Sequence, residues 1–312
     1  MTTITRTARP AAAAALPRRR AKKRRDGRAA LVFLAPWLLG ILLVTAGPLL
    51  ASLYLSFTQY NLISAPVWVG FSNFIALFND PNFLASAGAT LIYVVVSVPL
   101  VLVLALLLAS ALNAKLRGMV IYRTLFYIPT LLGASVAIAV LWSELFSTNG
   151  AVNNLLSIFH ITGLSWLGDP STALYTLVAL NVWTFGGTMV IFLAGLRQIP
   201  VSLYEAAELD GAGRWRKFTS VTFPTLSPVI FFNGLMVTIA AFQSFTPAYV
   251  VSNGTGGPVN STLLYSLYVY QVGFEQLRMG YAAAAAWVLV IIIGGLTAIA
   301  FSTSRFWVHY GD

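Results

Sequence analysis

Three of the nine acidic residues in this 312-residue chain fall within six consecutive positions, as Glu205, Glu208 and Asp210. Ser202, three positions before Glu205, completes a capping-box pattern, which predicts that a short helix begins there. Gly211 can adopt the left-handed conformation that ends such a helix about two turns later. The expected product is a short helix with an acidic surface, and such a surface can bind basic groups of another protein.

The residues after Gly211 predict a second short helix. It would run through Trp215 and Phe218 and end at Pro224, because proline interrupts a helix interior. The small side chains of Ala206 and Ala207 would let the first helix enter a partner's groove closely. The simpler interpretation is a helix–turn–helix without a partner, in which Glu205 serves only its own cap.

Catalytic and cofactor-binding patterns are missing from the sequence. There are no paired carboxylates, no HExxH motif and no serine–histidine arrangement, so no catalytic residue is predicted. The chain has no cysteine, and its two histidines, His160 and His309, are far apart, so no metal site is predicted. No lysine follows the glycine pattern of a P-loop, which excludes ATP binding of that kind. We therefore expect no enzyme and no cofactor bound by this chain.

The composition explains what must position the acidic segment. The chain has 58% apolar and 9% charged residues and a mean hydropathy of +0.80, values typical of an integral membrane protein. Stretches of about 20 apolar residues can cross a bilayer as helices. Six of them predict an all-α protein with six transmembrane helices, at 29–57, 89–111, 121–146, 173–196, 226–251 and 281–306.

The basic residues predict which side each loop faces. Ten of the 19 lie in the first 28 positions, where they form a tail drawn to anionic membrane lipid and not a nucleic-acid-binding fold. With this tail inside, 18 of the 19 basic residues fall on the cytoplasmic side, and only Arg278 lies outside. The positive-inside rule therefore places both termini and the Glu205 segment in the cytoplasm.

The segment at 205–228 resembles the EAA loop of bacterial ABC-importer permeases of the carbohydrate-uptake (maltose-type) class. The matching residues are Glu205-Ala206-Ala207, Asp210-Gly211-Ala212, Phe223-Pro224 and Pro228. Val221 and Phe223 stand where that family more often has Ile and Leu. Segments at 54–61, 69–74 and 280–284 resemble the same permeases, so the similarity covers nearly the whole chain after the tail.

The resemblance implies a type I ABC-importer permease fold with a cytoplasmic coupling helix, in the bacterial plasma (inner) membrane. It also implies a second homologous permease subunit, two ABC ATPase subunits that hold ATP-Mg, and an extracytoplasmic solute-binding protein. The coupling residues would be Glu205, Ala206, Ala207, Glu208, Asp210 and Gly211. The expected regions are 1–28 (tail), 29–88 (first helix and external segment), 89–306 (permease core with the coupling loop 199–225) and 307–312 (cytoplasmic end).

Uncharged polar groups in the fourth and fifth spans predict a path for a neutral sugar. Amides and hydroxyls can exchange hydrogen bonds with sugar hydroxyls, and aromatic rings can stack on the apolar face of a pyranose. The Gly186-Gly187 pair and Pro247 should loosen the helices there. The other interpretation is that these side chains hold helices together. The predicted residues are Asn181, Trp183, Phe185, Thr188, Phe242, Gln243 and Ser244.

The leading hypothesis is a permease subunit that carries a di- or oligosaccharide in an ATP-driven importer. The alternatives are an ABC permease for glycerol phosphate or another small solute, and a membrane-embedded enzyme for lipid-linked sugars that uses Glu144 or Asp169. An anionic substrate should require a cation in the path, and the spans contain none away from their ends. A proton- or sodium-coupled carrier is disfavoured because Glu144 is the only carboxylate in the apolar spans.

Overall fold

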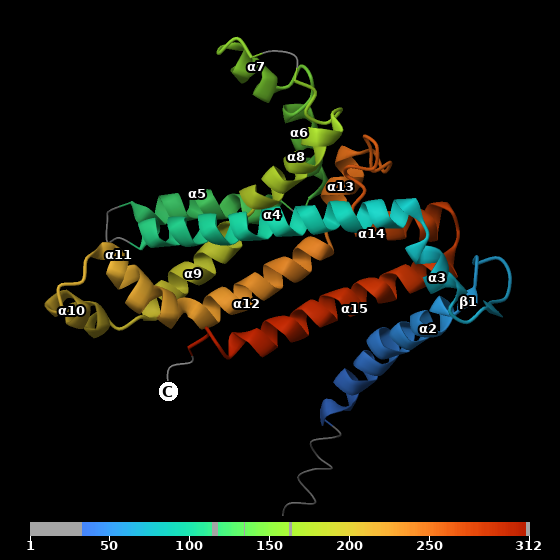
Figure 1. The fold of residues 1–312 in the computed structure, drawn as a ribbon, viewed down its shortest axis with the longest axis horizontal. Coiled ribbons are helices and arrows are strands. Elements are labelled where there is room, and N and C mark those ends of the chain that lie inside the picture. The colour runs from blue at the N-terminus through green and yellow to red at the C-terminus, as the bar shows by residue number, and fades with distance from the viewer. Residues whose placement is uncertain (1–32, 114–117, 134, 162–163, 310–312) are drawn as a thin grey trace, which may run out of the picture. The chain divides into compact units, whose positions relative to one another are not determined.

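The computed structural model describes residues 33–113, 118–133, 135–161 and 164–309, and nearly all of its regular elements are helices (Figure 1). The basic tail at 1–28 and the last three residues lie outside the described residues. The chain divides into two units, 1–51 and 52–312. By length and composition, the described part has four helices able to cross a membrane, or up to six if each bent pair is one span.

The first apolar stretch is helical from its first described residue. It runs from Phe33 to Ser56 over 24 residues and includes a π-helical segment η1 (Ile41–Ala46) followed by α2 (Gly47–Ser56). The predicted span at 29–57 therefore agrees with the described part of this helix.

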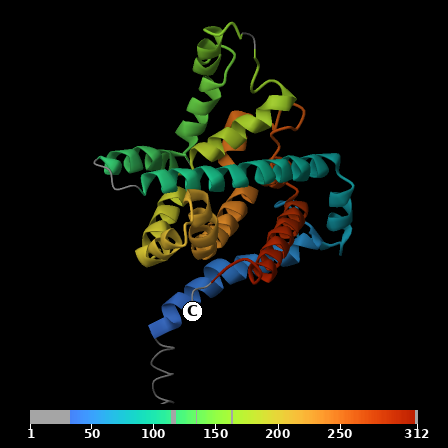
Figure 2. The ribbon, with the colours of Figure 1, turned by 60° about the vertical axis from the view of Figure 1, so that its left-hand side comes forward.

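The second unit is built around α4 (Pro81–Leu112), which packs against α8, α9, α12 and α14 (Figures 1 and 2). This helix begins eight residues before the predicted span at 89–111. Asp80 accepts a hydrogen bond from the backbone N–H of Asn82 at 2.9 Å, and Pro81 occupies the first turn, where its missing N–H costs nothing. The N-cap at Asp80, and not the start of the apolar run, determines where α4 begins.

The third predicted span, 121–146, is not a single helix. It consists of α5 (Met119–Leu132) and α6 (Val136–Leu145), whose axes differ by 102°. The backbone N–H of Gly133 bonds to the carbonyl of Pro129, and the Ser135 hydroxyl then accepts from the N–H of Ile138 at 3.3 Å to start a new helix. The single-helix prediction is wrong because a cap lies inside one apolar run. A short α7 (Ala151–Ser157) follows.

The fourth span is bent where the glycine pair predicted it. Helices α8 (Pro170–Trp183) and α9 (Gly186–Gln198) meet at 41°. The fifth span likewise divides between α12 (Phe223–Phe242) and α13 (Thr246–Val251), just before Pro247. Both breaks lie among the residues that were predicted to form the substrate path.

The prediction that Pro224 ends a helix is wrong. After α10 (Val201–Leu209), helix α11 (Arg214–Lys217) continues through η2 (Phe218–Thr222) directly into α12. The N–H of Phe223 bonds to the carbonyl of Phe218, five residues earlier. This wide π turn makes room for the ring of Pro224, which then lies in the first turn of α12.

The remaining elements are the last span and the segments that pack at the end of the bundle where α4 begins. A two-stranded hairpin, β1 (Thr58–Gln59) with β2 (Val67–Trp68), pairs Thr58 with Trp68 and is followed by α3 (Ser72–Phe78). The chain then returns through α14 (Tyr265–Tyr270), η3 (Gln271–Glu275) and α15 (Met279–Ser304). The centroid of the Phe57 ring lies 5.5 Å from that of Trp68 and 5.2 Å from that of Phe71, so these aromatic side chains pack on one another.

Asp80 also joins three parts of the chain at this end. Its Oδ2 accepts hydrogen bonds from the hydroxyls of Tyr268, at 2.8 Å, and Tyr281, at 3.1 Å. Burial raises the pKa of the Asp80 carboxyl, but the bonds from Tyr268, from the N–H of Asn82 and from Tyr281 outweigh it, so the pKa lies below its ordinary value. The ionised carboxylate therefore stabilises the fold above the unfolded-state pKa near 4, and this stabilisation is lost as the pH falls through the folded-state pKa.

We predict that Asp80→Asn lowers the free energy of unfolding at neutral pH by about 1.5–3 kcal/mol, the range for a hydrogen bond to a charged group. Asp169→Asn is the matched control, because Asp169 also caps a helix that begins with proline but bonds only within its own turn, to Ser171. Melting curves in detergent should show a larger fall in melting temperature for Asp80→Asn than for Asp169→Asn. The difference between Asp80→Asn and the wild type should become smaller at acid pH. Equal losses for both variants would contradict the prediction.

Candidate functional site

A cavity of about 320 Å³ lies where the breaks in the fourth and fifth spans face α4 and α5. The break between α12 and α13, together with the start of α13, contributes five consecutive residues, and α8 contributes its last turn. No acidic or basic side chain is among the lining residues. They are Tyr93, Thr130, Gly133, Leu180, Asn181, Thr184, Ala240, Gln243, Ser244, Phe245, Thr246 and Pro247.

Asn181 carries the unusual polar group of this cavity. Its Nδ2 is buried and has no hydrogen-bond partner among the described residues. On the other wall, the Tyr93 hydroxyl lies 3.5 Å from the Ser244 hydroxyl. A buried amide that bonds to nothing costs about 1–3 kcal/mol, so this amide is suited to a ligand oxygen. The wall can both donate and accept hydrogen bonds without supplying a charge.

Thr130 fixes the geometry of the break between α8 and α9. Its hydroxyl donates to the carbonyl of Thr184 at 3.0 Å and accepts from the N–H of Gly187 at 2.8 Å. A side chain at Gly186 would collide with the carbonyl oxygen of Phe126, so glycine is needed for α5 to lie this close. Through these contacts α5 holds the Asn181 wall in place.

The structure brings together three of the seven residues predicted for a substrate path, namely Asn181, Gln243 and Ser244. The other four do not line this cavity. Trp183 packs on Trp142 with ring centroids 5.9 Å apart, and Phe185 is buried in the core beside Phe126. Thr188 is half-buried on α9, outside the cavity, and Phe242 faces a different, apolar cavity.

Tyr93, Thr130, Thr184 and Thr246 also line the cavity but were not among the predicted path residues. Tyr93 and Thr130 belong to the second and third spans, far from the fourth in sequence. Hydroxyl groups are common in membrane helices, where they can bond to their own backbone. Only their position facing the break distinguishes these four residues.

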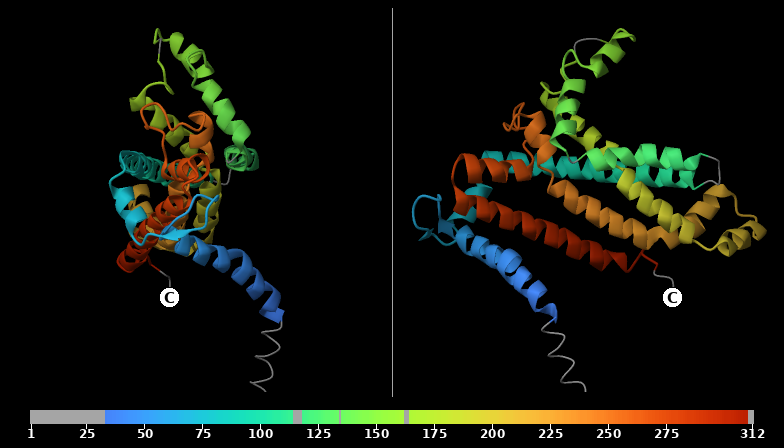
Figure 3. Two further views of the ribbon diagram at one scale, coloured as in Figure 1. Left: turned by 90° about the vertical axis from the view of Figure 1, so that its right-hand side faces the viewer. Right: turned by 180° about the vertical axis from the view of Figure 1, so that it is seen from behind.

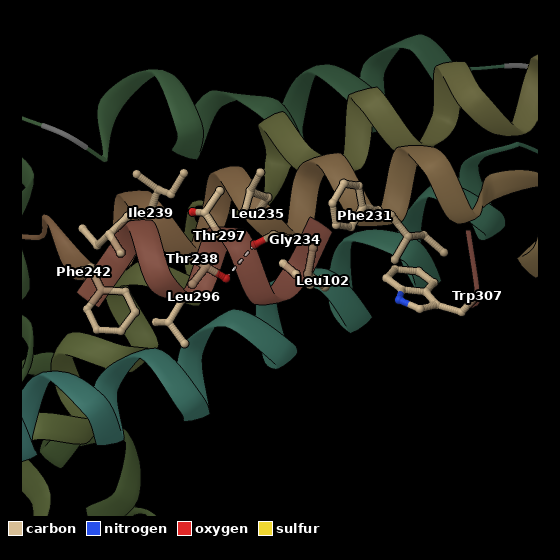
Figure 4. Close-up of a pocket in the computed structure, with 13 residues that line it drawn as sticks. Leu102, Phe231, Gly234, Leu235, Thr238, Ile239, Phe242, Leu296, Thr297 and Trp307 are labelled. Atoms are coloured by element: carbon tan, nitrogen blue, oxygen red, sulfur yellow. Dashed lines mark hydrogen bonds between the residues drawn. The ribbon is translucent and has the colours of Figure 1, made fainter. Parts of the chain in front are cut away.

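A second cavity, of about 310 Å³, lies between α12 and α15 (Figure 4). Its lining is almost wholly apolar, and the hydroxyl of Thr238 already donates to the carbonyl of Gly234 at 2.6 Å. Leu235, Leu296 and Trp307 surround it. It has few polar groups that could bond to a hydrophilic ligand, so the cavity at Asn181 is the better candidate site.

The acidic segment forms α10, which projects with α11 from one end of the bundle (Figure 3). The prediction that Ser202 caps this helix is wrong. Pro200 occupies the cap position, no side chain caps the helix, and the N–H of Leu203 bonds to the Pro200 carbonyl at 3.2 Å. The fixed φ of proline, −59° here, leads the chain into the helix two residues earlier than a serine cap would.

The predicted stop at Gly211 is confirmed. Gly211 has a φ of +73°, and its N–H bonds to the carbonyl of Glu208 at 3.0 Å. The N–H of Ala212 bonds to the carbonyl of Ala207 at 2.9 Å, which completes a Schellman motif. This tight end turns the chain back into α11.

The surface of α10 is both acidic and apolar. Glu208 pairs with Lys217 at 3.0 Å, whereas Glu205 and Asp210 are exposed and form no ion pair within the described residues. Leu209 is 90% exposed beside them, so it does not anchor the helix. Tyr204 does, through a 3.0 Å hydrogen bond between its hydroxyl and that of Thr222. This part of α10 therefore presents an apolar side chain and two carboxylates to solvent.

Comparison with known proteins gives the family. The model of the family described as binding-protein-dependent transport system inner membrane component matches residues 69–307, from just before α3 to just after α15. The chain belongs to this family. As a member of it, the chain is a transporter component of the inner membrane, which agrees with its apolar helices.

Relatives of this permease-family chain are similar over nearly their whole length. It is 48% identical over 289 residues to the probable ABC transporter permease protein YesP of Bacillus subtilis (strain 168), covering 92% of this chain and 94% of that protein. It is 37% identical over 280 residues to the lactose transport system permease protein LacF of Rhizobium radiobacter, with 88% and 93% covered.

A solved structure supports the fold. One chain in the crystal structure of a bacterial alginate ABC transporter, in complex with an alginate pentasaccharide-bound periplasmic protein, superposes with a TM-score of 0.74. It covers 95% of this chain and all of that chain at 23% sequence identity. The ABC-importer permease fold predicted from the sequence is thereby confirmed.

Proposed function

We propose that this chain is one of two permease subunits of an ATP-driven importer and that its cavity at Asn181 is part of the path of a di- or oligosaccharide. The observation that supports the sugar is the lining of that cavity, which combines amide and hydroxyl groups with aromatic rings and has no charge. Neutral polyhydroxylated ligands suit such a wall. The lactose permease relative is consistent with this class of substrate.

ATP hydrolysis belongs to a separate pair of subunits. The free carboxylates of Glu205 and Asp210, with the exposed Leu209, form the surface through which α10 contacts an ATPase. Ala206 is exposed and Ala207 half-buried, so their small side chains let the helix approach closely. The Schellman turn at Gly211 and the continuous helix from α11 into α12 would transmit movement of α10 to the Gln243–Pro247 wall of the cavity.

The proposed topology has both termini and α10 in the cytoplasm. The basic tail 1–28 precedes the first helix and external segment at 29–88, and the permease core follows at 89–306. The coupling loop covers 199–225, and 307–312 is the cytoplasmic end. The second permease subunit, two ATPase subunits carrying ATP-Mg, and an extracytoplasmic solute-binding protein complete the importer.

Glycerol phosphate is the second candidate substrate, and the cavity argues against it because no cation is among its lining residues. An enzyme that uses Glu144 or Asp169 is also disfavoured. Asp169 caps α8, and hydrogen bonds from the hydroxyl and the N–H of Ser171 hold its pKa below the ordinary value. A carboxyl held ionised in this way is a poor general acid.

The test is uptake into cells or proteoliposomes that contain the chain with its partner subunits. Radiolabelled disaccharides and oligosaccharides should accumulate only with ATP, and glycerol phosphate should not accumulate. Accumulation of glycerol phosphate alone would replace the sugar by an anionic substrate. Accumulation of a sugar without any ATPase subunit would overturn the proposed mechanism.

A further inference from the structure

A cleft of about 510 Å³ runs between α5 and α9, separate from the cavity at Asn181. Two arginines line it, together with a hydroxyl, a phenol and small or branched apolar side chains, and no carboxylate is among the lining residues. The residues are Arg123, Thr124, Tyr127, Val190, Leu193, Ala194 and Arg197. The transport mechanism proposed above uses none of them.

Among the described residues, Arg123 makes one side-chain hydrogen bond in the cleft, and one of its buried donors has no partner. Its Nη2 donates to the carbonyl of Leu112 at 2.7 Å, which fixes the guanidinium at the end of α4. Its Nε is buried and finds no acceptor in the part of the chain that the structure describes. Since a buried donor of a charged group is costly to leave unbonded, this nitrogen indicates an acceptor other than the described residues.

Arg197 adds a second charge in the last turn of α9. Within the described residues the only salt bridge joins Lys217 and Glu208, so neither arginine of the cleft is neutralised by a carboxylate there. The planar guanidinium presents donors in a fork that matches the oxygens of a phosphate. Two unneutralised arginines in one cleft therefore favour an anion.

The apolar part of the cleft indicates what kind of anion. Val190 and Arg197 are about 10 Å apart along the axis of α9, from the rise of 1.5 Å per residue. Leu193 and Ala194 lie between them. The cleft is thus charged at the end of the helix and apolar towards the middle of the bundle, in the direction in which a membrane lipid changes from headgroup to acyl chain.

The position of the cleft agrees with the cytoplasmic leaflet. Its charged end lies where α5 begins and α9 ends, the same end of the bundle as α10 and α11 (Figures 1 and 3). Anionic phospholipids bind in basic pockets between transmembrane helices on that side. We infer that the cleft binds an anionic phospholipid, with the phosphate between Arg123 and Arg197 and an acyl chain along Val190–Ala194.

The experiment is native mass spectrometry of the purified transport complex, titrated with phosphatidylglycerol or phosphatidylcholine. The wild type should retain phosphatidylglycerol in preference to phosphatidylcholine. The variant Arg197→Gln should bind it about fivefold more weakly, since each arginine near a membrane surface contributes about that factor. Arg305→Gln is the matched control, because Arg305 lies over the ring of Phe306 and outside the cleft. It should bind phosphatidylglycerol as the wild type does.

Arg123 also bonds to Leu112, so Arg123→Lys combined with Arg197→Gln tests the pair while keeping one positive charge at position 123. This double variant should lose more affinity than Arg197→Gln alone. Inorganic phosphate at millimolar concentration should not displace the lipid. Unchanged lipid binding in Arg197→Gln and in the double variant would overturn the inference. Displacement of the lipid by inorganic phosphate alone would overturn it as well. The readout counts bound lipid, so it is independent of whether the complex transports sugar.

Discussion

Replacing Glu205 by lysine is expected to abolish coupling, with retention of the ATPase subunits on the affinity-purified chain lower by at least about 30-fold. Glu205 is exposed on α10 and forms no ion pair within the described residues, so its carboxylate is available to a partner's basic group. Removing one member of a charge pair that is buried and hydrogen-bonded in an interface costs about 2–5 kcal/mol, and 2 kcal/mol is about 30-fold in affinity. A lysine adds repulsion to that loss.

The control for this variant is Glu144→Lys, which makes the same charge reversal at an exposed carboxylate on α6, far from α10 (Figure 1). It should leave ATPase retention unchanged. Glu205→Gln separates charge from shape and should show a smaller loss than Glu205→Lys. Full ATPase retention by Glu205→Lys together with normal uptake would leave α10 as a surface helix without a partner.

The sequence predicted where this surface lies but not how its helix begins. The glycine stop at Gly211 was predictable because a left-handed turn strongly favours glycine. The start was not, since Ser202 and Glu205 satisfy a capping pattern while Pro200, two residues earlier, imposes the entry by its fixed φ. A motif of side-chain oxygens cannot show which of two adjacent starts the backbone takes.

For the membrane helices, too, the sequence pattern predicted their approximate positions but not every break within them. Apolar length predicted six crossing stretches, and the glycine pair at Gly186 predicted the bend between α8 and α9. The sharp break after Gly133 was missed because the apolar run continues through it. Hydropathy measures the preference of a segment for lipid, and it does not record where a hydroxyl such as that of Ser135 caps a new helix.

The candidate cavity was partly predictable for a related reason. Amides are rare at membrane depth, so Asn181 and Gln243 stood out in the sequence. Tyr93 and Thr130 did not, because they become neighbours of Asn181 only when the second and third spans pack against the fourth. The same packing turned Trp183 towards Trp142 and away from the cavity. The sequence identified candidate polar residues, and the tertiary packing determines which of them line the cavity.

Asn181→Leu is expected to lower the rate of sugar uptake at saturating substrate by about 10- to 100-fold. Leucine is close to asparagine in size and removes both hydrogen-bonding atoms. The Nδ2 of Asn181 is buried in the cavity wall without a partner in the described residues, so a substrate hydroxyl is its natural acceptor. Leaving a buried polar group of the substrate unpaired costs about 1–3 kcal/mol during passage.

Asn233→Leu is the matched control, because it makes the same substitution at another membrane-depth asparagine. Asn233 is 3% exposed on α12, and its Nδ2 donates to the carbonyl of Val229 at 2.9 Å in its own helix. It does not line the cavity. Uptake measured with labelled sugar should therefore fall in Asn181→Leu and stay close to the wild-type rate in Asn233→Leu. If both variants lose uptake equally, while chain levels in the membrane fall in parallel, the amide of Asn181 holds helices together and does not contact the sugar.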